Sequence, residues 1–418
     1  MIKVLAPQAY CKPEQMASSH LWNHLDEAFA KAGLYHVIYA PTPTRGVSDD
    51  IRKEYKKRKL EVMYDGKLEI YRFSLYGEGK NPLLRAIRYF ISCFISLNKC
   101  LFGKAAKDCN VIYSVSTPPI IGAMSAIVKK CRKIPFVYVL QDIFPDSLVV
   151  TGLAKKGGLL WKIGRVIENF TYKHADKIIV ISEDFKKNIM AKGVPEDKIV
   201  VVYNWVDQNA VIDVPREENK LFDKYGLDRS KFYVTYNGNI GLSQNMDMLL
   251  EVASELQTEH ADINFVLVGQ GAYLDEVKRI VAEKKLDHVH LLPFQPYEDI
   301  SHVFSLGDVS LVISKPGTGA ASVPSKTWSI MSASRPVLAN FDENELKDIV
   351  EKNHCGIFTK AGDKEAFKDA ILKLYGDREL CKEYDKNGRQ FVMDNLTKEA
   401  GTQKYVDVIK DVCKVSRW

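Results

Sequence analysis

The stretch "KFYVTYNGNIGLSQNMDMLLEVASELQ", residues 231–257, contains the folding unit that recurs along this chain. Its first residues alternate and carry aromatic and β-branched side chains, so they predict a β-strand. Its last residues place apolar side chains at helical spacing. Between them, Gly238 and Gly241 allow backbone to approach a ligand closely, and a glycine turn that leads into a helix N-terminus suits a phosphate. The turn has no Lys or Arg, so a bound phosphate would need a cation from elsewhere.

Short apolar strands followed by helical stretches occur on both sides of this unit. The expected strands are "IKVLAP", "YHVIYAP", "NVIYSVS", "PFVYVLQD", "KIIVIS" and "KIVVVYNWVD" in the first half, and "FYVTYNG", "INFVLVGQG", "VHLLPF", "VSLVIS" and "RPVLAN" in the second. This alternation predicts parallel strands with crossover helices. We therefore expect an α/β protein with two doubly wound domains, 1–206 and 207–395, and a final helical segment, 396–418, that packs back toward the first domain. Ligands are expected at the carboxyl ends of the strands.

The composition fits a globular protein and excludes some partners. The 418 residues suit two α/β domains. A net charge of +6 is too small to predict a nucleic-acid partner, but it is compatible with an anionic membrane surface or small ligand. The eight cysteines form no Cys-x-x-Cys, and there is no Asp-x-Asp or His-rich cluster, so no disulfide framework and no metal site are predicted. The N-terminus "MIKVLAP" lacks a signal-peptide pattern, and a reducing cytoplasm is the simplest location.

The longest apolar tract, "LLRAIRYFISCFISLNKCLF" at 83–102, has two interpretations. It contains Arg85, Arg88, Asn98 and Lys99, and it is therefore a poor membrane-spanning helix. It could lie in a membrane interface with its basic residues at the lipid headgroups. We favour the other interpretation, in which the helix packs on the core and keeps a basic edge.

The cation missing from residues 236–245 has a candidate further along the chain. In "SKPGTGAASVPSKTWSIMSASRPVLAN", residues 314–340, a strand end is followed by a loop rich in Gly and Ala, and then by Pro324, Ser325 and Lys326 at the expected start of a helix. A lysine opposes the helix dipole there, and a bound anion would reverse that cost. We therefore predict that Lys326 meets a phosphate, and a solvated lysine is an equally open alternative.

Polar residues that follow two strands of the first half are candidates for a cleft. In "VSTPPI", Thr117 and Pro118 follow a strand, and in "LQDIFPDS", Gln141, Asp142 and Asp146 follow the next one. Polar residues at strand ends, next to a proline bend, are typical of binding sites. The alternative, that both aspartates are turn or cap residues, is equally open.

Two further pairs of residues are better explained by local structure when each is taken alone. Gly269 and Gly271, in "FVLVGQGAYLDEV", lack the third glycine of a dinucleotide fingerprint and suit a tight turn between strand and helix. His20 and His24 lie one turn apart in the first helix. His20 could face the cleft, but a position on the helix surface is the simpler interpretation.

Taken in order, these segments resemble the family-four retaining glycosyltransferases of the GT-B fold, and within them the bacterial O-antigen and capsule transferases. The resemblance extends over nearly the whole chain. It rests on "YCKPEQMAS", "STPPIIGAMSA", "QDIFPDSLVVTGL", "HADKIIVISED", "VVVYNWVD", "NGNIGLSQNMDMLLEVA", "VGQG", "VPSK" and "RPVLA". It implies two Rossmann-like domains that face each other across a cleft.

The resemblance also implies an activity. A sugar would be transferred, with retained anomeric configuration and without a metal or other cofactor, from a nucleotide-diphosphate donor that we expect to be UDP-linked. The donor would bind to the second domain. The acceptor, a glycan or a polyprenyl-diphosphate-linked sugar, would bind to the first domain. The enzyme would be cytoplasmic, with a possible peripheral contact at the inner face of the plasma membrane.

Individual residues take their roles from their positions in these motifs. The donor-binding positions are Gly238, Asn239, Ile240, Gly241, Gln244, Gly269, Gly271, Gln295, Ser325 and Ser329. The catalytic positions are Lys326, Asp142 and Gln141, and the acceptor-binding positions are Thr117, Pro118, Asp146 and His20. Within the donor set, residues 238–241 would line the diphosphate, Ser325 would meet the phosphates from the other side, and Gln295 would lie near the base.

The chain departs from the family in the segment before "RPVLA". Relatives carry a pair of glutamates where this chain has Ala321 and Ser329. The second glutamate normally accepts hydrogen bonds from the ribose, so weaker or rearranged ribose binding is expected. Two other functions stay open. One is a non-hydrolysing sugar-nucleotide epimerase, which would require more carboxylates and histidines in its cleft than this sequence offers. The other is a degenerate glycosyltransferase-like protein that binds sugar nucleotides, or partners an active enzyme, without catalysis.

Overall fold

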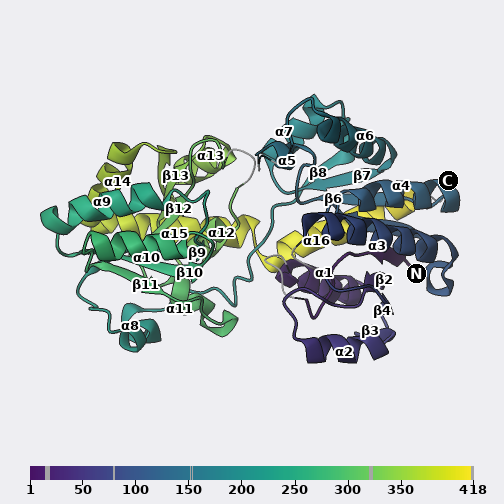
Figure 1. The fold of residues 1–418 in the computed structure, drawn as a ribbon, viewed down its shortest axis with the longest axis horizontal. Helices are drawn as coiled ribbons and strands as arrows, with labels where there is room; N and C mark the ends of the chain where they lie inside the picture. The colour runs from purple at the N-terminus through teal and green to yellow at the C-terminus, as the bar shows by residue number, and fades with distance from the viewer. Residues whose placement is uncertain (15–18, 79–80, 151, 153, 320–322, 416–418) are drawn as a thin grey trace. The chain divides into compact units, whose positions relative to one another are not determined.

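The chain folds into two α/β units, each built around one sheet (Figure 1). A computed structural model describes residues 1–418 except 15–18, 79–80, 151, 153, 320–322 and 416–418. The first unit comprises Met1–Tyr203 with Glu399–Trp418, and the second comprises Asn204–Lys398. The second unit thus begins at Asn204, a few residues before the expected 207. The prediction of two domains with parallel sheets is confirmed.

The first unit has an eight-stranded sheet with the order β3-β4-β2-β1-β5-β6-β7-β8. Its strands are β1 (Lys3–Pro7), β2 (Tyr35–Pro41), β3 (Leu60–Met63), β4 (Leu68–Phe73), β5 (Val111–Val115), β6 (Phe136–Leu140), β7 (Lys177–Val180) and β8 (Ile199–Val201). Its helices are α1 (Ser19–Lys31), α2 (Asp49–Lys57), α3 (Pro82–Phe102), α4 (Ile120–Arg132), α5 (Asp146–Val150), α6 (Leu159–His174), α7 (Glu183–Ala191) and the final α16 (Lys398–Val415).

The second unit has a six-stranded, parallel sheet with the order β11-β10-β9-β12-β13-β14. Its strands are β9 (Phe232–Asn239), β10 (Ile263–Gln270), β11 (Val289–Leu292), β12 (Val309–Ile313), β13 (Val337–Phe341) and β14 (Gly356–Lys360). Its helices are α8 (Lys220–Tyr225), α9 (Met246–Glu259), α10 (Leu274–Glu283), α11 (Ile300–Phe304), α12 (Lys326–Ser332), α13 (Glu345–Lys352), α14 (Lys364–Gly376) and α15 (Arg378–Asn395).

One edge of the first sheet differs from the parallel pattern that the sequence predicts. Strand β3 pairs with β4 in the antiparallel direction. The chain reverses between them at Tyr64, Asp65 and Gly66, all of which have positive φ. Such φ values are typical of a tight hairpin turn with an Asp-Gly sequence. The strand–helix alternation does not include the two strands of this hairpin, so the sequence does not predict the antiparallel pair.

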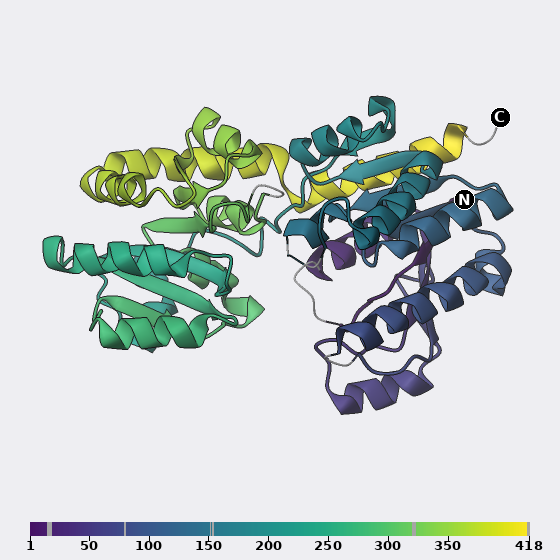
Figure 2. The same ribbon diagram turned by 45° about the horizontal axis from the view of Figure 1, so that its top comes forward.

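Helices cover both faces of the first sheet. On one face, the buried ring of Tyr113 (β5) packs edge-on against Phe29 of α1 and Tyr405 of α16, with ring centroids 6.0 and 6.4 Å away. On the other face, α4 packs between α3 and α6. Figures 1 and 2 both show α16, in yellow, running along the first unit. The last helix therefore completes the core of the unit in which the chain begins.

Helix α3 corrects one prediction about the apolar tract. Arg88 is fully buried, and its guanidinium donates to the carbonyl of Tyr76 at 3.0 Å and to the hydroxyl of Thr44 at 3.2 Å. An arginine held in this way cannot reach lipid headgroups, so the expected basic edge is wrong at this position. No helix among the described residues is long and apolar enough to cross a membrane.

Candidate functional site

The carboxyl edge of the second sheet brings two glycine turns into direct contact. Gly238 of β9 lies opposite Gly269 of β10 in the parallel ladder. A Cβ on Gly269, which has φ +157°, would lie 1.9 Å from the carbonyl oxygen of Gly238. A Cβ on Gly271 would lie 2.2 Å from the carbonyl oxygen of Ile240. Both glycines are therefore required for the close approach of the two turns, which supports the structural explanation for this pair.

The turn that precedes α9 is shaped by Gln244. Its Oε1 accepts hydrogen bonds from the backbone N–H of Gly241 at 3.0 Å and from Nδ2 of Asn239 at 3.4 Å. Asn245, the N-cap residue of α9, adopts a left-handed conformation and makes no side-chain cap bond. The first N–H groups of a 14-residue helix thus lack a side-chain cap at the edge where the sequence predicts a phosphate.

Lys326 reaches this turn from the first residue of α12. Its Nζ lies 3.7 Å from the ring centroid of Tyr236, and a Cβ on Gly238 would lie 3.6 Å from it. Nζ is buried and has no hydrogen-bond partner. Burial without a counter-ion lowers the pKa of Lys326 to about 7. The structure therefore brings the predicted cation next to the predicted phosphate turn and leaves the ammonium group without an anion.

The two other basic residues of segment 314–340, Lys315 and Arg335, are already engaged. The ammonium of Lys315 lies 3.6 Å from the carboxylate of Asp247. The guanidinium of Arg335 bonds to Asp213 at 2.9 Å and to the carbonyl of Ser305 at 3.1 Å. Lys326 is thus the better candidate of the three, because binding of an anion there breaks no existing ion pair.

Three polar residues that sequence reasoning missed lie at or near the same edge. Asn237, Ser314 and Thr327 are nearly inaccessible to solvent, and the amide atoms of the first and the hydroxyl oxygens of the other two have no hydrogen-bond partner. Asn237 directly precedes Gly238 and Thr327 follows Lys326, so adjacency to the motif was the available signal. Unpaired buried polar groups are costly, and a ligand that would pair with them is one explanation for such groups.

The remaining donor positions vary in their accessibility. Ser325 is the exposed N-cap of α12 and makes no cap bond, and Ser329 is partly buried one turn later. The side chain of Gln295 is buried, donates to the hydroxyl of Tyr225 at 2.8 Å and accepts from Lys224 at 2.9 Å. Its amide group is thus engaged within the protein. Ala321 lies outside the described residues.

In the first unit, two predicted residues line one small cavity. Thr117 and Gln141 share a space of about 80 Å³ with Gln8, Tyr10 and Trp22. The side chain of Gln141 also bonds to Tyr405 of α16. Asp142 follows directly, its N–H donates to Ser116 Oγ at 3.2 Å, and burial raises the pKa of its carboxyl group.

The other candidates of the first unit do not line this cavity. Asp146 forms an ion pair with Lys192 at 2.7 Å. Pro118 is buried, and the ring of His20 lies against that of His24 with centroids 6.0 Å apart. The structure therefore brings Thr117 and Gln141 together in a cavity that Asp146, Pro118 and His20 do not line. In the described part of the chain, no group of three or more His, Cys, Asp or Glu side chains is placed to hold a metal ion.

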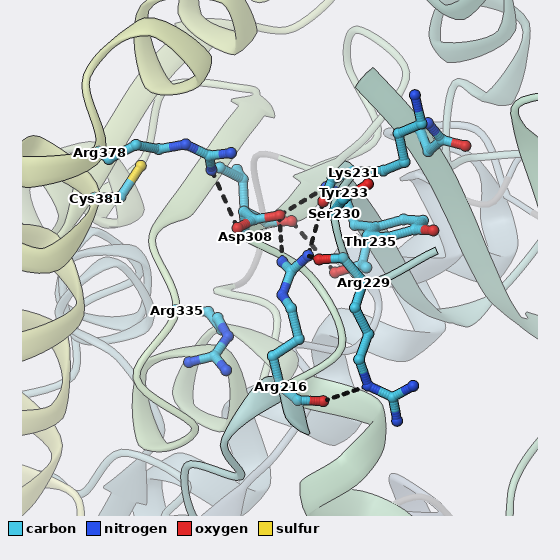
Figure 3. Close-up of polar contacts among 12 residues, drawn as sticks. Arg216, Arg229, Ser230, Lys231, Tyr233, Thr235, Asp308, Arg335, Arg378 and Cys381 are labelled. Atoms are coloured by element: carbon cyan, nitrogen blue, oxygen red, sulfur yellow. Dashed lines mark hydrogen bonds and ion pairs between the residues drawn. The ribbon is translucent and has the colours of Figure 1, made fainter. Parts of the chain in front are cut away.

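A second set of charged residues lies at the opposite, amino edge of the second sheet (Figure 3). Asp308 precedes β12 and accepts hydrogen bonds from Arg216 at 2.6 Å, from Arg378 at 3.1 Å and from the N–H of Tyr233 at 2.8 Å. We call these four residues the Asp308 cluster. The cluster connects β9, β12 and α15 with the segment before α8, and its ion pairs therefore stabilise the second unit.

Comparisons with known proteins agree with this fold. Residues 21–210 match the family model Glycosyltransferase Family 4, and residues 217–391 match the model Glycosyl transferases group 1. Two solved structures align over nearly their whole length. HepE of Anabaena, crystallised with UDP, has a TM-score of 0.72 and 16% identity over 98% of this chain and 100% of that one. A sucrose-phosphate synthase from Thermosynechococcus elongatus has a TM-score of 0.74 and 15% identity over 99% and 100%.

Sequence relatives belong to the same class of enzyme. The "Probable glycosyltransferase WbjE" of Pseudomonas aeruginosa is 26% identical over 68% of this chain and 70% of its own length. WcaI of Escherichia coli (strain K12), named for colanic acid biosynthesis, is 28% identical over 46% of this chain, and the alignment spans 48% of that protein. The chain is a glycosyltransferase of the GT-B fold, with a family-four domain followed by a group-1 domain.

Proposed function

We propose that this glycosyltransferase moves a sugar from a UDP-linked donor to a lipid-linked glycan acceptor, with retained configuration, in the synthesis of a surface polysaccharide at the cytoplasmic face of the membrane. The observation that carries the donor part is the buried, unpaired ammonium group of Lys326 beside Gly238. The UDP bound in the HepE crystal structure supports the donor class, and the naming of WcaI for colanic acid biosynthesis supports the pathway class.

The reaction requires stabilisation of a leaving diphosphate. The bond between the anomeric carbon and the β-phosphate oxygen breaks, and negative charge grows on that oxygen. The acceptor oxygen forms the new bond to the anomeric carbon, and its proton leaves with the diphosphate. In this proposal Lys326 and the N–H groups at the start of α9 stabilise the charge, as preorganised donors do in other enzymes. No metal is assigned a role.

The lowered pKa of Lys326 suits this task. An unpaired buried ammonium costs free energy in the unliganded protein, and a phosphate beside it restores the charged form. Part of the cost of burial is therefore recovered only when the donor is bound. Because charge on the phosphate grows further as the glycosidic bond breaks, the interaction is strongest in the transition state.

In the first unit, we assign the acceptor to the cavity lined by Thr117 and Gln141. Asp142 follows Gln141 at the same strand end, where the residue is exposed to solvent, and partial desolvation raises the pKa of its carboxyl group. The acceptor hydroxyl would be placed by these strand-end residues, while the donor remains on the second unit.

The test is a panel of nucleotide sugars, measured first by thermal shift and then by product formation. A donor present at a hundred times its dissociation constant adds roughly 2.7 kcal/mol to the free energy of unfolding. We expect UDP to stabilise the protein, and one UDP-sugar to be hydrolysed slowly or transferred to a glycan acceptor. Stabilisation without any turnover, with every sugar and acceptor tried, would favour a non-catalytic binding protein instead.

A further inference from the structure

Helix α3 exposes a face that is almost entirely apolar. Among its residues 84–98, those exposed as whole residues are Leu84, Ala86, Ile87, Phe90, Ile91, Phe94 and Asn98, and the side chain of Arg85 is 43% exposed. Phe90 and Phe94 are 61% and 60% exposed. A surface helix normally turns its charged and polar residues toward water. The outer face of α3 therefore needs a partner other than water.

Helix α6 exposes a second apolar face on the same side of the sheet. Its residues Leu159, Leu160, Ile163 and Val166 are 77%, 50%, 49% and 69% exposed. Helix α4, whose Ile127 is also exposed, packs against both α3 and α6. The three helices thus form one layer, and each contributes apolar side chains to its outer surface.

The two helices differ in charge. Between residues 84 and 98 of α3, the only charged side chain with substantial exposure is that of Arg85, which is 43% exposed and forms an ion pair with Glu78 at 3.3 Å. Helix α6 and the residues before it contribute the exposed Lys155, Lys156 and Lys162. The only acidic residue of segment 154–174 is Glu168, which is buried and bonds to Lys192 at 2.9 Å. The surface is therefore mainly apolar along α3 and both apolar and basic along α6.

Both apolar faces lie near the strand ends that carry the candidate acceptor site. On α3, the hydroxyl of Tyr89 is 2.6 Å from that of Tyr10, which follows β1 and lines the cavity with Thr117. On α6, a Cβ on Gly164 would lie 2.6 Å from Pro145, which follows β6. Most of the exposed apolar residues thus lie in the halves of α3 and α6 that adjoin this edge of the sheet, and Phe102, 80% exposed, lies at the other end of α3.

We propose that α3 and α6 form a surface that binds an anionic lipid bilayer, with α3 supplying a mainly apolar contact and α6 adding lysines that meet lipid phosphates. Basic and apolar side chains on helices that lie flat are typical of interfacial membrane binding. A second copy of the chain fits less well, because a two-fold contact centred on α6 would bring its lysines against the same lysines of the other copy. The link to a lipid-linked acceptor rests on the proposed function, whereas the binding surface does not.

Because α3 contributes apolar contacts and α6 contributes lysines, variants of the two helices should respond differently to salt and to lipid charge. The test uses the full chain and lipid vesicles. Co-sedimentation is measured with phosphatidylcholine alone and with added phosphatidylglycerol, at low salt and at about 0.5 M salt, where charges are screened beyond roughly 4 Å. The variants are Phe90→Ser with Phe94→Ser on α3, and Lys155→Glu with Lys156→Glu and Lys162→Glu near α6. Leu60→Ser with Val62→Ser, on the exposed strand β3 of the same unit, is the matched control.

We expect the α3 variant to lose at least about tenfold in binding at both salt concentrations, about 1.4 kcal/mol or more. The lysine variant should lose a similar factor only with anionic vesicles at low salt, and the control should bind as the wild type does. All variants should keep the wild-type melting temperature and bind UDP equally, which separates this test from that of the proposed function. Unchanged vesicle binding by the α3 variant would overturn the proposal, as would a shift from dimer to monomer in sedimentation velocity with vesicle binding unaltered.

Discussion

The two edges of the second sheet use positive charge in opposite ways. At the amino edge, the two guanidiniums of the Asp308 cluster share one carboxylate, and Arg378 also lies 4.2 Å from the ring centroid of Phe232. At the carboxyl edge, the ammonium of Lys326 lies over the ring of Tyr236 but has no carboxylate and no hydrogen bond. Both cations contact an aromatic ring, so the aromatic contact does not separate them. The two cations differ in whether the protein itself supplies an anion: Arg378 has the carboxylate of Asp308, and Lys326 has none.

This difference indicates which charged groups stabilise the folded unit and which are available to bind a ligand. Charge in a satisfied network stabilises the native state at all times, whereas charge that is buried without a partner destabilises it until something binds. Asp385, near the Asp308 cluster, shows the contrasting case of a carboxyl group: one oxygen has no partner, and burial raises its pKa to about 7. With this pKa the group is about half protonated at pH 7. It lies beside the Asp308 cluster rather than beside the glycine turns, so an unpaired buried group does not by itself indicate a ligand.

The largest expected effect is on catalysis. Lys326→Met removes the charge and keeps much of the apolar stem, and it should lower kcat by about 10²–10³, the loss typical for one preorganised electrostatic donor. Donor affinity should change less, because the interaction is strongest in the transition state. Lys326→Arg should recover only part of the activity, since a planar guanidinium does not replace a compact ammonium group. Initial rates over a range of donor concentrations provide both constants.

The control for this prediction is Lys315→Met, at the same edge. Its lysine is already near Asp247, so the variant should keep most of the activity. A greater loss of kcat in Lys315→Met than in Lys326→Met would show that the leaving phosphate has a different partner.

The next effect is on stability at the amino edge. Asp308→Ala leaves two arginines and the N–H of Tyr233 without their shared acceptor, and it should lower the free energy of unfolding by about 2 kcal/mol. Urea unfolding at constant m-value measures this change. UDP affinity of the folded protein should stay within about twofold. Loss of UDP binding with little loss of stability would reverse the roles assigned to the two edges.

A smaller effect concerns pH and the stability of the Lys326→Met variant. The pKa of Lys326 is about 7 in the folded protein and about 10.5 when unfolded, so between these values the unfolded chain binds more protons. The contribution of Lys326 therefore makes the wild type less stable as pH falls from 10.5 to 7. Without ligand, Lys326→Met should be more stable than the wild type by about 2 kcal/mol more at pH 7 than at pH 9. Thermal unfolding of both proteins over this range measures the difference, and parallel pH profiles would contradict it.

The smallest expected effect is that of a chelator. If the N–H groups at the start of α9 and Lys326 neutralise the leaving diphosphate, turnover should be unchanged within about twofold after treatment with EDTA. The assay needs a metal-free buffer and a re-addition step with Mg²⁺ or Mn²⁺. Strict dependence of the rate on the added metal would contradict this mechanism.

Local features of the fold could be predicted from the sequence because they depend on neighbouring residues. The alternation of strands and helices predicts two doubly wound domains, and Ser182 caps α7 as its position before Glu183 and Asp184 suggests, accepting a bond from the N–H of Phe185 at 3.0 Å. The position of Lys326 at the first residue of α12 follows from the same kind of local pattern.

Features that depend on distant residues could not be predicted. Whether Gly269 is required by a ligand or by packing is decided by the carbonyl of Gly238, 31 residues earlier, which no local pattern contains. The burial of Arg88 depends on Thr44 and on the backbone of Tyr76. The unpaired state of Asn237 depends on every residue around it. The sequence therefore indicates which residues could bind a phosphate, but only the tertiary contacts show which polar groups are left without partners.

The most direct test of this account is the pKa of the Lys326 ammonium group, measured by NMR of labelled lysine side chains, with Lys326→Met used for assignment. In the protein without ligand, we predict a pKa near 7, because Nζ is buried without a counter-ion. With saturating UDP, the same group should titrate well above 7, because the diphosphate stabilises its charged form. A pKa near 10.5 without ligand, or a pKa that UDP does not change, would contradict the claim that Lys326 is buried without an anion and binds the diphosphate of the donor.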